Sequence, residues 1–283
     1  MSSSPHGFDP GPLACREIAA RALAEDLGSL GDLTSAALVP PDLEGVASIV
    51  SRGAGVVAGT APATEAFAQI DSTLSLEWEL RDGDPVSPGQ CLGRVRGRLR
   101  SILTAERTAL NLLGHLSGVA TATRRFVDAA GGGAQVRDTR KTLPGLRALE
   151  KAAVRAGGGR NHREGLSDAI LVKDNHLRVV GVGEAVVRVR DLWPGRLVEV
   201  ECDTLEQVVA AKEARVDLVL LDNMSPEMVA EAVALLDGAA PVEVSGGVTL
   251  DRVSAYVAAG ADFLSVGAIT FSASSLDVGL DLD

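Results

Sequence analysis

The chain has 283 residues and a formal net charge of −11, and aromatic side chains make up only 3% of it. This length suits two domains, whereas the acidic balance and the scarcity of aromatic stacking platforms argue against nucleic acid as a partner. We expect no membrane span and no export signal, because no apolar run approaches the roughly 18 residues of a membrane helix and residues 1–12 look like a disordered lead. Three widely spaced cysteines (Cys15, Cys91 and Cys202) indicate a reducing cytoplasm rather than a disulfide framework or a zinc site.

The first third of the chain mixes helical and strand patterns. An amphipathic helix is predicted over 13–27, and strands are predicted within 46–59 and over 74–80, where apolar and polar residues alternate. The turn-rich segment 81–97 is similar to the small β-sandwich of biotinyl carrier domains, but it lacks the Met-Lys modification site of a carrier. A helical pattern over 103–130 follows and is expected to link two domains.

Beyond this helix, short apolar runs recur at intervals of about one helix plus one loop. This alternation predicts βα units on a parallel sheet, and the number of runs suits a barrel or a partial barrel. In such folds the chemistry lies at the carboxyl ends of the strands. The runs are 169–172, 197–200, 218–221, 242–244 and 263–266.

Polar or glycine residues follow every one of these runs. Any single one is readily explained, because a strand end meets water, but five matched positions favour a common site. They are Lys173 to His176, Glu201, Asp222 with Asn223, Ser245 to Gly247, and Gly267 with Ala268.

Two of these strand ends carry carboxylates, Glu201 and Asp222. Hard oxygen ligands of this kind suit Mg²⁺, which binds through one or two carboxylates together with substrate phosphates. The alternative for these two residues is an ion pair with Lys173 or Arg140.

The glycine-rich ends point to a phosphate. Backbone N–H groups of Ser245–Gly247 and of Gly267–Ala268 can cradle a phosphate with no side chain in the way. By itself Ser-Gly-Gly is a weak motif, and it is equally compatible with a tight turn. Its place on the last strands of a barrel is what favours a phosphoester.

The stretch 137–176 carries an excess of lysine and arginine inside an acidic chain. Burial of an unpaired charge costs several kcal/mol, so this cluster favours a small, multiply charged anion as its ligand. The charges within its helical pattern, Arg147, Lys151 and Arg155, are expected on a solvent-exposed helix face. The cationic candidates for the site are Arg140, Lys141, His162, Arg163 and Lys173.

Two residues of the predicted linking helix also attract attention. Arg107, in the sequence TAERT, is expected near the start of this helix, where an arginine opposes the helix dipole, so an external anion is expected beside it. His115 is interpreted as an interior histidine with a hydrogen-bond partner.

Taken together, these segments resemble the quinolinate phosphoribosyltransferases over most of the chain. The strongest parts of the resemblance are AERTALNLLGHLSGVAT, DTRKTLPGLRALEKAAVRAGGGRNHREGLSDAILVKDNH, LLDN and EVSGG. The resemblance implies an α/β fold, with an α/β sandwich domain (1–118) before an incomplete parallel α/β barrel (119–270). A tail (271–283) is expected to pack back on the first domain.

The resemblance also implies the reaction. Quinolinate and phosphoribosyl pyrophosphate would become nicotinate mononucleotide, pyrophosphate and CO₂, with Mg²⁺, in NAD biosynthesis. A cytoplasmic homodimer or higher homo-oligomer with shared active sites is expected, in which Arg107 reaches into the partner's site.

Residue roles follow from the same resemblance. Catalysis is assigned to Lys141, Lys173, Glu201 and Asp222, with Glu201 and Asp222 also on the Mg²⁺–pyrophosphate side. The quinolinate carboxylates are assigned to Arg140, His162, Arg163 and Lys173. The 5′-phosphate is assigned to Ser245, Gly246, Gly247, Gly267 and Ala268.

Three other functions stay open at this point. A related phosphoribosyltransferase of the same fold would act on another acid, although the full basic set argues for a diacid. A phosphosugar isomerase or lyase on a barrel would need an acid/base pair, which Glu201 and Asp222 can supply. A non-catalytic metabolite sensor would have little use for both carboxylates.

Overall fold

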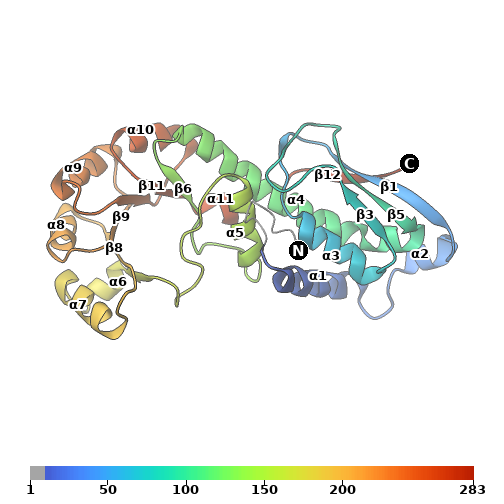
Figure 1. The fold of residues 1–283 in the computed structure, drawn as a ribbon, viewed down its shortest axis with the longest axis horizontal. Coiled ribbons are helices and arrows are strands. Elements are labelled where there is room, and N and C mark those ends of the chain that lie inside the picture. Colours follow the sequence, from blue (N-terminus) through green and yellow to red (C-terminus); the bar gives the residue numbers. More distant parts are fainter. Residues whose placement is uncertain (1–9) are drawn as a thin grey trace. The chain divides into compact units, whose positions relative to one another are not determined.

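The computed structural model describes residues 10–283, so most of the predicted disordered lead lies outside the described residues. The chain divides into two compact units, and neither is continuous in sequence. The first comprises residues up to 124 together with 142–158 and 268–283, and the second comprises 125–141 and 159–267. Figure 1 shows the helices and strands of both units.

A four-stranded antiparallel sheet forms the framework of the first unit, in the order β12-β1-β5-β3. These strands are β1 (Glu44–Ser51), β3 (Ser75–Trp78), β5 (Cys91–Arg98) and β12 (Val278–Leu282). A separate two-stranded ladder joins β2 (Gly55–Val56) to β4 (Pro85–Val86). The carboxyl-terminal strand thus adds an edge to a sheet built from the first hundred residues.

Three helices, α1 (Pro12–Leu27), α3 (Thr60–Ile70) and the first part of α4 (Leu99–Ala130), share one apolar core with this sheet. The same unit also contains α2 (Leu33–Leu38), α5 (Arg147–Ala156) and α11 (Ala268–Phe271). Ile49 and Val95 of the sheet pack with Phe67 of α3 and with Ile102 and Leu113 of α4, and all five are fully buried. The predicted helix over 13–27 and the strand over 74–80 are confirmed, with small differences at their ends.

Gly118 shows why α4 carries small residues on one side. A Cβ atom on Gly118 would lie 2.2 Å from the carbonyl oxygen of Ser274, and one on Gly114 would lie 2.9 Å from that of Leu276. The segment before β12 therefore runs against the helix backbone, and only glycine permits this approach.

The long helix begins earlier than predicted. Strand β5 ends at Arg98 and α4 starts at Leu99, without an intervening loop. Arg107 therefore lies well inside the helix, and the argument that it opposes the dipole at a helix start was wrong. Arg100 is also helical, and its guanidinium Nε donates to the Val39 carbonyl at 3.2 Å.

The helix α5 corrects another expectation. Lys151 is 1% exposed, and Arg147 and Arg155 are half-buried. The expectation that these three charges lie on a solvent-exposed helix face was therefore wrong. Glu150 beside Lys151 is fully buried as well, and its carboxylate Oε1 lies 2.8 Å from His115 Nε2 of α4. Buried charges of this kind require partners.

The second unit is a parallel sheet of six strands in the order β6-β11-β10-β9-β8-β7, and it is the predicted incomplete barrel. Each of the five apolar runs of the sequence contributes one strand. The strands are β6 (Gln135–Arg137), β7 (Ile170–Val172), β8 (Val198–Cys202), β9 (Leu218–Asp222), β10 (Val242–Ser245) and β11 (Phe263–Ser265). No described residues pair β6 directly with β7, so the barrel is open.

Helices connect these strands and lie outside the sheet (Figure 1). They are α6 (Asp174–Leu177), α7 (Val182–Leu192), α8 (Leu205–Glu213), α9 (Pro226–Leu236), a short 3₁₀ turn (Leu250–Arg252) and α10 (Val253–Ala258). Ser225 caps α9 by accepting from the Met228 N–H, and Thr204 caps α8 by accepting from Gln207. The parallel arrangement brings the ends of all six strands to one edge.

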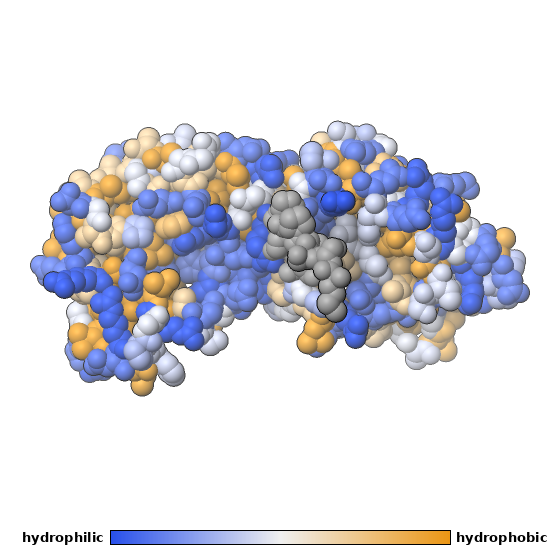
Figure 2. Space-filling view, in the orientation of Figure 1, coloured by the Kyte–Doolittle hydropathy of each residue, from blue (hydrophilic) through white to orange (hydrophobic). Residues whose placement is uncertain are grey.

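Hydrophilic and hydrophobic residues are interspersed on the face shown in Figure 2. Val179 and Trp193, on the segments around α7, are among the exposed apolar side chains, with exposed fractions of 82% and 57%. Within residues 10–283, every helix is too short or too polar to cross a bilayer.

Candidate active site

The carboxyl ends of the parallel strands open into a cavity of about 370 Å³. The strand register explains the convergence, because Asp222 pairs with Ser245 and Ser245 pairs with Ser265 on adjacent strands. The cavity is lined by Thr139, Arg140, Lys141, His162, Arg163, Leu171, Lys173, Glu201, Leu220, Asp222, Ser245 and Ser265. The structure thus brings eight of the predicted site residues together.

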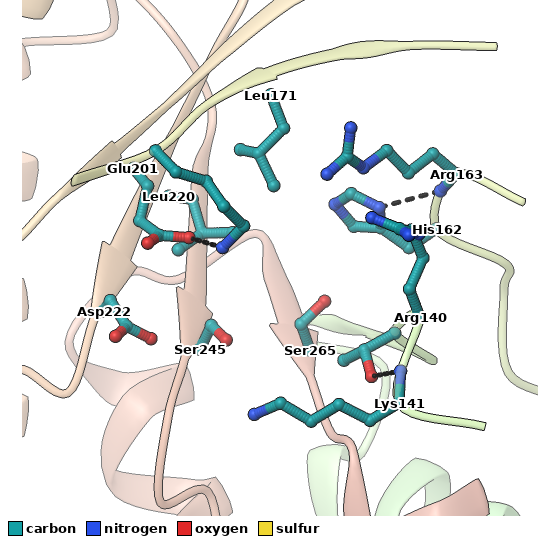
Figure 3. Close-up of a pocket in the computed structure, with 12 residues that line it drawn as sticks. Arg140, Lys141, His162, Arg163, Leu171, Glu201, Leu220, Asp222, Ser245 and Ser265 are labelled. Carbon is teal, nitrogen blue, oxygen red and sulfur yellow. Dashed lines mark hydrogen bonds and ion pairs between the residues drawn. The ribbon is translucent and has the colours of Figure 1, made fainter. Parts of the chain in front are cut away.

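The cavity has two chemically different sides. Figure 3 shows Arg140, His162 and Arg163 on one side, and Glu201 and Asp222 on the other. The side chains of Leu171 and Leu220 lie between them and add an apolar section to the wall. A flat anion with a second, phosphate-bearing reactant beside it would match this division.

Lys141 reaches across the floor of this view toward the side that carries Asp222 and Ser245 (Figure 3). Its backbone N–H donates to the Thr139 hydroxyl at 2.9 Å, which fixes the turn after β6. A Cβ atom on Gly267 would lie 3.0 Å from Lys141 Cδ, so the glycine leaves room for the lysine stem. The Thr139 hydroxyl therefore fixes the backbone of Lys141, and the lack of a side chain at Gly267 leaves space for the lysine stem.

Both ring nitrogens of His162 are engaged within the protein. Nδ1 accepts the backbone N–H of Arg163 at 2.7 Å, and Nε2 lies 3.1 Å from Glu199 Oε2 and 3.3 Å from Glu243 Oε1. Burial lowers the pKa of His162, but the hydrogen bond to Glu199 and the charges of Glu243 and Glu199 outweigh it, so the net pKa is raised. The imidazole is thus a fixed part of the wall, with its polar atoms directed into the protein.

A buried acidic pair lies behind this imidazole. Glu199 and Glu243 are 5% and 0% exposed, and Arg137 Nη1 lies 2.6 Å from Glu243 Oε2. The Arg137 guanidinium stacks on Phe263 at 3.4 Å from the ring centroid. Burial, and then the nearby Glu199 charge, raise the pKa of Glu243. Arg137 and the His162 imidazole are therefore the cationic partners of these two buried carboxylates.

This cluster has the composition of a metal site but a simpler explanation. Among the described residues, one group of three potential metal ligands has its donor atoms within 4.8 Å of one another, and it consists of His162, Glu199 and Glu243. Glu243 is already satisfied by Arg137 and by the Ser265 hydroxyl, and the imidazole bridges the pair. These contacts supply the partners that the buried carboxylates require, so we interpret the cluster as structural support for His162.

Asp138 fixes the chain on the other side of His162. It is 0% exposed, and it accepts the His162 backbone N–H at 2.8 Å and the Asn161 amide at 2.5 Å. Asp138 thereby connects the end of β6 to the segment that carries His162 and Arg163.

Lys173 and Glu201 form an ion pair at the ends of β7 and β8. This is the ion pair that the sequence left open as an alternative to metal binding. Glu201 is 7% exposed, whereas the Lys173 side chain is 43% exposed at the mouth of the cavity. A bound anion can attract Lys173 and release Glu201, so the ion pair does not exclude either residue from a site.

Asp222 lies at the end of β9 and is half-buried. Burial, and then the Asp203 carboxylate, raise its pKa, while Lys173 and Lys141 act in the opposite direction. Its carboxylate therefore lies between the lysines on one hand and the Asp203 and Asp174 carboxylates on the other, where a cation or a hydroxyl group could bind it.

Comparisons with known proteins agree with this architecture. The model of the quinolinate phosphoribosyl transferase amino-terminal domain matches residues 32–117, and that of the carboxyl-terminal domain matches 119–281. The chain belongs to the quinolinate phosphoribosyltransferase family. It is 45% identical to the nicotinate-nucleotide pyrophosphorylase [carboxylating] of Mycobacterium leprae, over 95% of this chain and 97% of that protein.

Other members of the family show the same likeness. The quinolinate phosphoribosyltransferase [decarboxylating] 2 of Nicotiana glauca is 41% identical over 95% of this chain and 82% of its own length. Among solved structures, the nicotinate-nucleotide pyrophosphorylase of Francisella tularensis superposes with a TM-score of 0.93 at 35% identity, covering 99% of this chain and 100% of that one.

The remaining predicted residues lie in separate places of this family member. Gly246 and Gly247 follow β10 with φ of +83° and +61°, which fits a tight turn after Ser245. Ala268 begins α11 and is counted with the first unit. Arg107 also belongs to the first unit, where its side chain is 63% exposed and lines a different cavity of about 410 Å³.

Several residues that support the site were not singled out by the sequence patterns, namely Arg137, Asp138, Asn161, Glu199 and Glu243. A usable signal existed for the two glutamates, because each lies inside one of the apolar runs 197–200 and 242–244, and unpaired acids are rarely buried. Their partners come from distant parts of the chain, so the pairing itself required the fold.

Proposed function

We propose that this protein is a quinolinate phosphoribosyltransferase, which converts quinolinate and phosphoribosyl pyrophosphate into nicotinate mononucleotide, pyrophosphate and CO₂ in NAD biosynthesis. One observation carries the proposal: a single cavity places Arg140 and Arg163 opposite Glu201 and Asp222, with Lys141 extending toward Asp222. The names of the matched relatives describe this same conversion. The chain spans nearly the whole length of the Mycobacterium leprae relative.

The cationic side is proposed to bind quinolinate. Quinolinate is a planar dianion, and the guanidinium groups of Arg140 and Arg163 can each grip a carboxylate with two hydrogen bonds. Lys173 adds a third positive charge at the cavity mouth. His162 contributes the ring face of a fixed imidazole and, through its Nδ1, holds the backbone of Arg163.

The acidic side is proposed to receive phosphoribosyl pyrophosphate. Lys141 would contact its phosphate groups, Asp222 its ribose and pyrophosphate region, and the turn at Ser245–Gly247 its 5′-phosphate. The extension of Lys141 toward Asp222, together with the positive φ of both glycines, supports this orientation. Gly267 and Ala268 are proposed to complete the phosphate site.

Mg²⁺ is proposed as the cofactor on this side. The donor chemistry fits, because Asp222 and Glu201 supply hard oxygen atoms at neighbouring strand ends. Lys173 holds one oxygen of Glu201, so Asp222 is the more accessible ligand. When bound, Mg²⁺ would neutralise the charge that develops on the pyrophosphate leaving group.

The reaction needs no protein nucleophile. The ring nitrogen of quinolinate bonds to the anomeric carbon as pyrophosphate leaves with the electron pair of the broken C–O bond. The carboxylate next to the ring nitrogen then departs as CO₂, its electron pair remains on the ring carbon beside the positive nitrogen, and that carbon takes up a proton. Glu201 and Asp222 would stabilise the positive ribosyl centre. Leu171 and Leu220 support partial desolvation of the departing carboxylate.

An assay of CO₂ release tests the function. The purified protein is incubated with quinolinate labelled in the carboxylate beside the nitrogen, with phosphoribosyl pyrophosphate and Mg²⁺. We expect labelled CO₂ and nicotinate mononucleotide in equal amounts, and we expect loss of both when the metal is chelated or phosphoribosyl pyrophosphate is omitted. Absence of CO₂ under all metal conditions would overturn the proposal. A product formed only from another acid would indicate a related phosphoribosyltransferase.

We further propose a cytoplasmic homodimer or higher homo-oligomer, in which Arg107 of one subunit serves the cavity of its partner. The exposure of Arg107 and its position in the first unit support this assignment. A third arginine, supplied by the partner subunit, would add to the positive charge of Arg140 and Arg163 that quinolinate meets.

A further inference from the structure

Asn223, directly after β9, has a backbone conformation that few residues adopt. Its φ is +56°, in the left-handed region where asparagine is enriched among non-glycine residues. Its backbone N–H donates to the Ser245 carbonyl at 2.9 Å, which extends the β9–β10 pairing by one step beyond the Asp222–Ser245 pair. The strand end is therefore locked to its neighbour just where the cavity begins.

The Asn223 side chain turns toward the site. Its amide Nδ2 donates to Asp222 Oδ2 at 2.6 Å. The other end of the amide rests on Gly246, where an added Cβ would lie only 2.3 Å from Asn223 Oδ1 and 2.6 Å from Cγ. The amide is thus held between the Asp222 carboxylate and the glycine turn that follows β10.

The other non-glycine residues with positive φ among residues 10–283 have a simpler explanation. Arg215 and Asp237, with φ of +54° and +50°, follow the ends of α8 and α9. A left-handed residue is a common way to end a helix. Asn223 ends a strand instead, and its side chain bonds to a residue of the cavity, so helix termination does not account for it.

We propose that Asn223 is a positioning residue, which holds the Asp222 carboxylate in one orientation toward the cavity and ties it to the Ser245–Gly247 turn. This inference rests on the proposed function, because it matters only if Asp222 and the turn serve the same reactant. The left-handed backbone directs the amide back onto Asp222, and Gly246 leaves the space that the amide fills. Asn223 would then fix the positions of the Asp222 carboxylate and the Ser245–Gly247 turn relative to each other, and both are proposed to contact phosphoribosyl pyrophosphate.

Asn223→Gly tests the amide without disturbing the backbone, because glycine adopts positive φ readily. Loss of one hydrogen bond to a charged group should lower kcat/KM for phosphoribosyl pyrophosphate by about tenfold, while KM for quinolinate stays near the parent value. The matched control is Asp237→Gly, at an exposed position of similar φ in the same unit. The control should retain parent kinetics, and neither variant should melt at a lower temperature.

Asn223→Asp keeps the size of the side chain and its tolerance of positive φ, but replaces the donor by a carboxylate that repels Asp222. We expect a larger loss in kcat/KM for phosphoribosyl pyrophosphate than with glycine. Two results would show a structural role only and would overturn the proposal. One is a loss of kcat/KM that is as large for quinolinate as for phosphoribosyl pyrophosphate in both variants. The other is a lowered melting temperature of Asn223→Gly.

Calorimetric titration with phosphoribosyl pyrophosphate and Mg²⁺, in the absence of quinolinate, gives a readout without turnover. The proposal expects Asn223→Gly to bind about tenfold more weakly than the parent and than Asp237→Gly. If parent and variant bind equally well, the positioning role is wrong while the enzyme function stands. If the parent protein neither binds this compound nor releases CO₂, the proposed function fails first.

Discussion

His162 shows how much a single residue's role depends on its neighbours. The resemblance to the family assigned it to a quinolinate carboxylate, yet in the structure both ring nitrogens are directed to the protein, one to Arg163 and the other to Glu199 and Glu243. The residue type and its nearness to the cavity were predictable. The direction of its hydrogen bonds was not, because the two glutamates come from separate strands.

Arg140 provides the sharpest test at this scale. Arg140→Ala removes one guanidinium fork from the cavity wall, so KM for quinolinate should rise by roughly tenfold to a hundredfold, with a smaller change for phosphoribosyl pyrophosphate. Arg140→Lys should recover only part of this loss, because an ammonium cannot bind a carboxylate through a planar fork. Steady-state kinetics with each substrate varied in turn measure both effects.

The matched control for Arg140 is Arg188→Ala. Arg188 lies in the same unit, and its side chain is 65% exposed and pairs with Glu184 on the surface of α7. Its loss changes the net charge equally and should leave both KM values unchanged. Unaltered kinetics of Arg140→Ala would remove Arg140 from the binding site.

At the scale of elements, local pattern predicted best where a strand or helix is long or strongly apolar. The strands β7 to β11 coincide with the apolar runs, because a strand buried on both faces is mostly apolar, even where a buried glutamate such as Glu199 or Glu243 lies within it. The strand β6 was missed, since it has only three residues and ends in Arg137, and it becomes a strand only by pairing with β11. The start of α4 was also missed, because no loop sequence separates it from β5.

Asp71 joins α3, the turn that follows it and α4 in the first unit. It caps the end of α3, accepts from the Thr73 hydroxyl and N–H at 2.6 and 3.0 Å, and accepts from the Ser101 hydroxyl of α4 at 2.9 Å. The hydrogen bonds from Thr73, followed by that from Ser101, lower the pKa of Asp71 to about 2. Its ionised form is therefore stabilised in the folded state.

The sign of the resulting pH dependence follows from this depressed pKa. Asp71 contributes stability above its unfolded value near 3.8, and the contribution is lost as pH falls through about 2. Asp71→Asn should therefore melt a few degrees below the parent at pH 7, and the difference should shrink as pH falls toward 2. Melting curves across this pH range measure it, with Asp42→Asn, at an exposed position, as the control. A difference independent of pH would contradict the assignment.

At the scale of the whole molecule, the chain does not build its units in sequence order. Residues 142–158 and 268–283 return to the first unit, and β12 pairs with β1 across more than two hundred residues of sequence. The family models divide the chain differently, at residues 117 and 119. A boundary drawn from the sequence alone follows the chain, whereas compactness follows contacts between distant segments.

The proposed oligomer gives a prediction for the assembled protein. Arg107→Ala and Asp222→Ala should each lack activity alone, the first because the partner's cavity loses an arginine and the second because its own cavity loses a carboxylate. Hybrid dimers would contain one cavity with both residues intact, so a fully exchanged equal mixture should recover about a quarter of the parent activity. Activity assays on mixtures, with hybrids verified by differential tags, measure the recovery. Verified hybrids without activity would show that Arg107 does not serve a partner.

The sequence by itself determined the alternation of strands and helices in the second unit and the polar residues at its strand ends, because both follow from local periodicity. It also carried the motifs that indicate the family. Only the tertiary structure decided that Glu199 and Glu243 hold His162, that Lys151 is buried, and that Asn223 bonds to Asp222 beneath Gly246. The physical reason is that burial, register and hydrogen-bond direction depend on residues that are distant in the chain: Asn223 and Asp222 are neighbours in sequence, but Ser245 and Gly246 on the adjacent strand hold the asparagine in place.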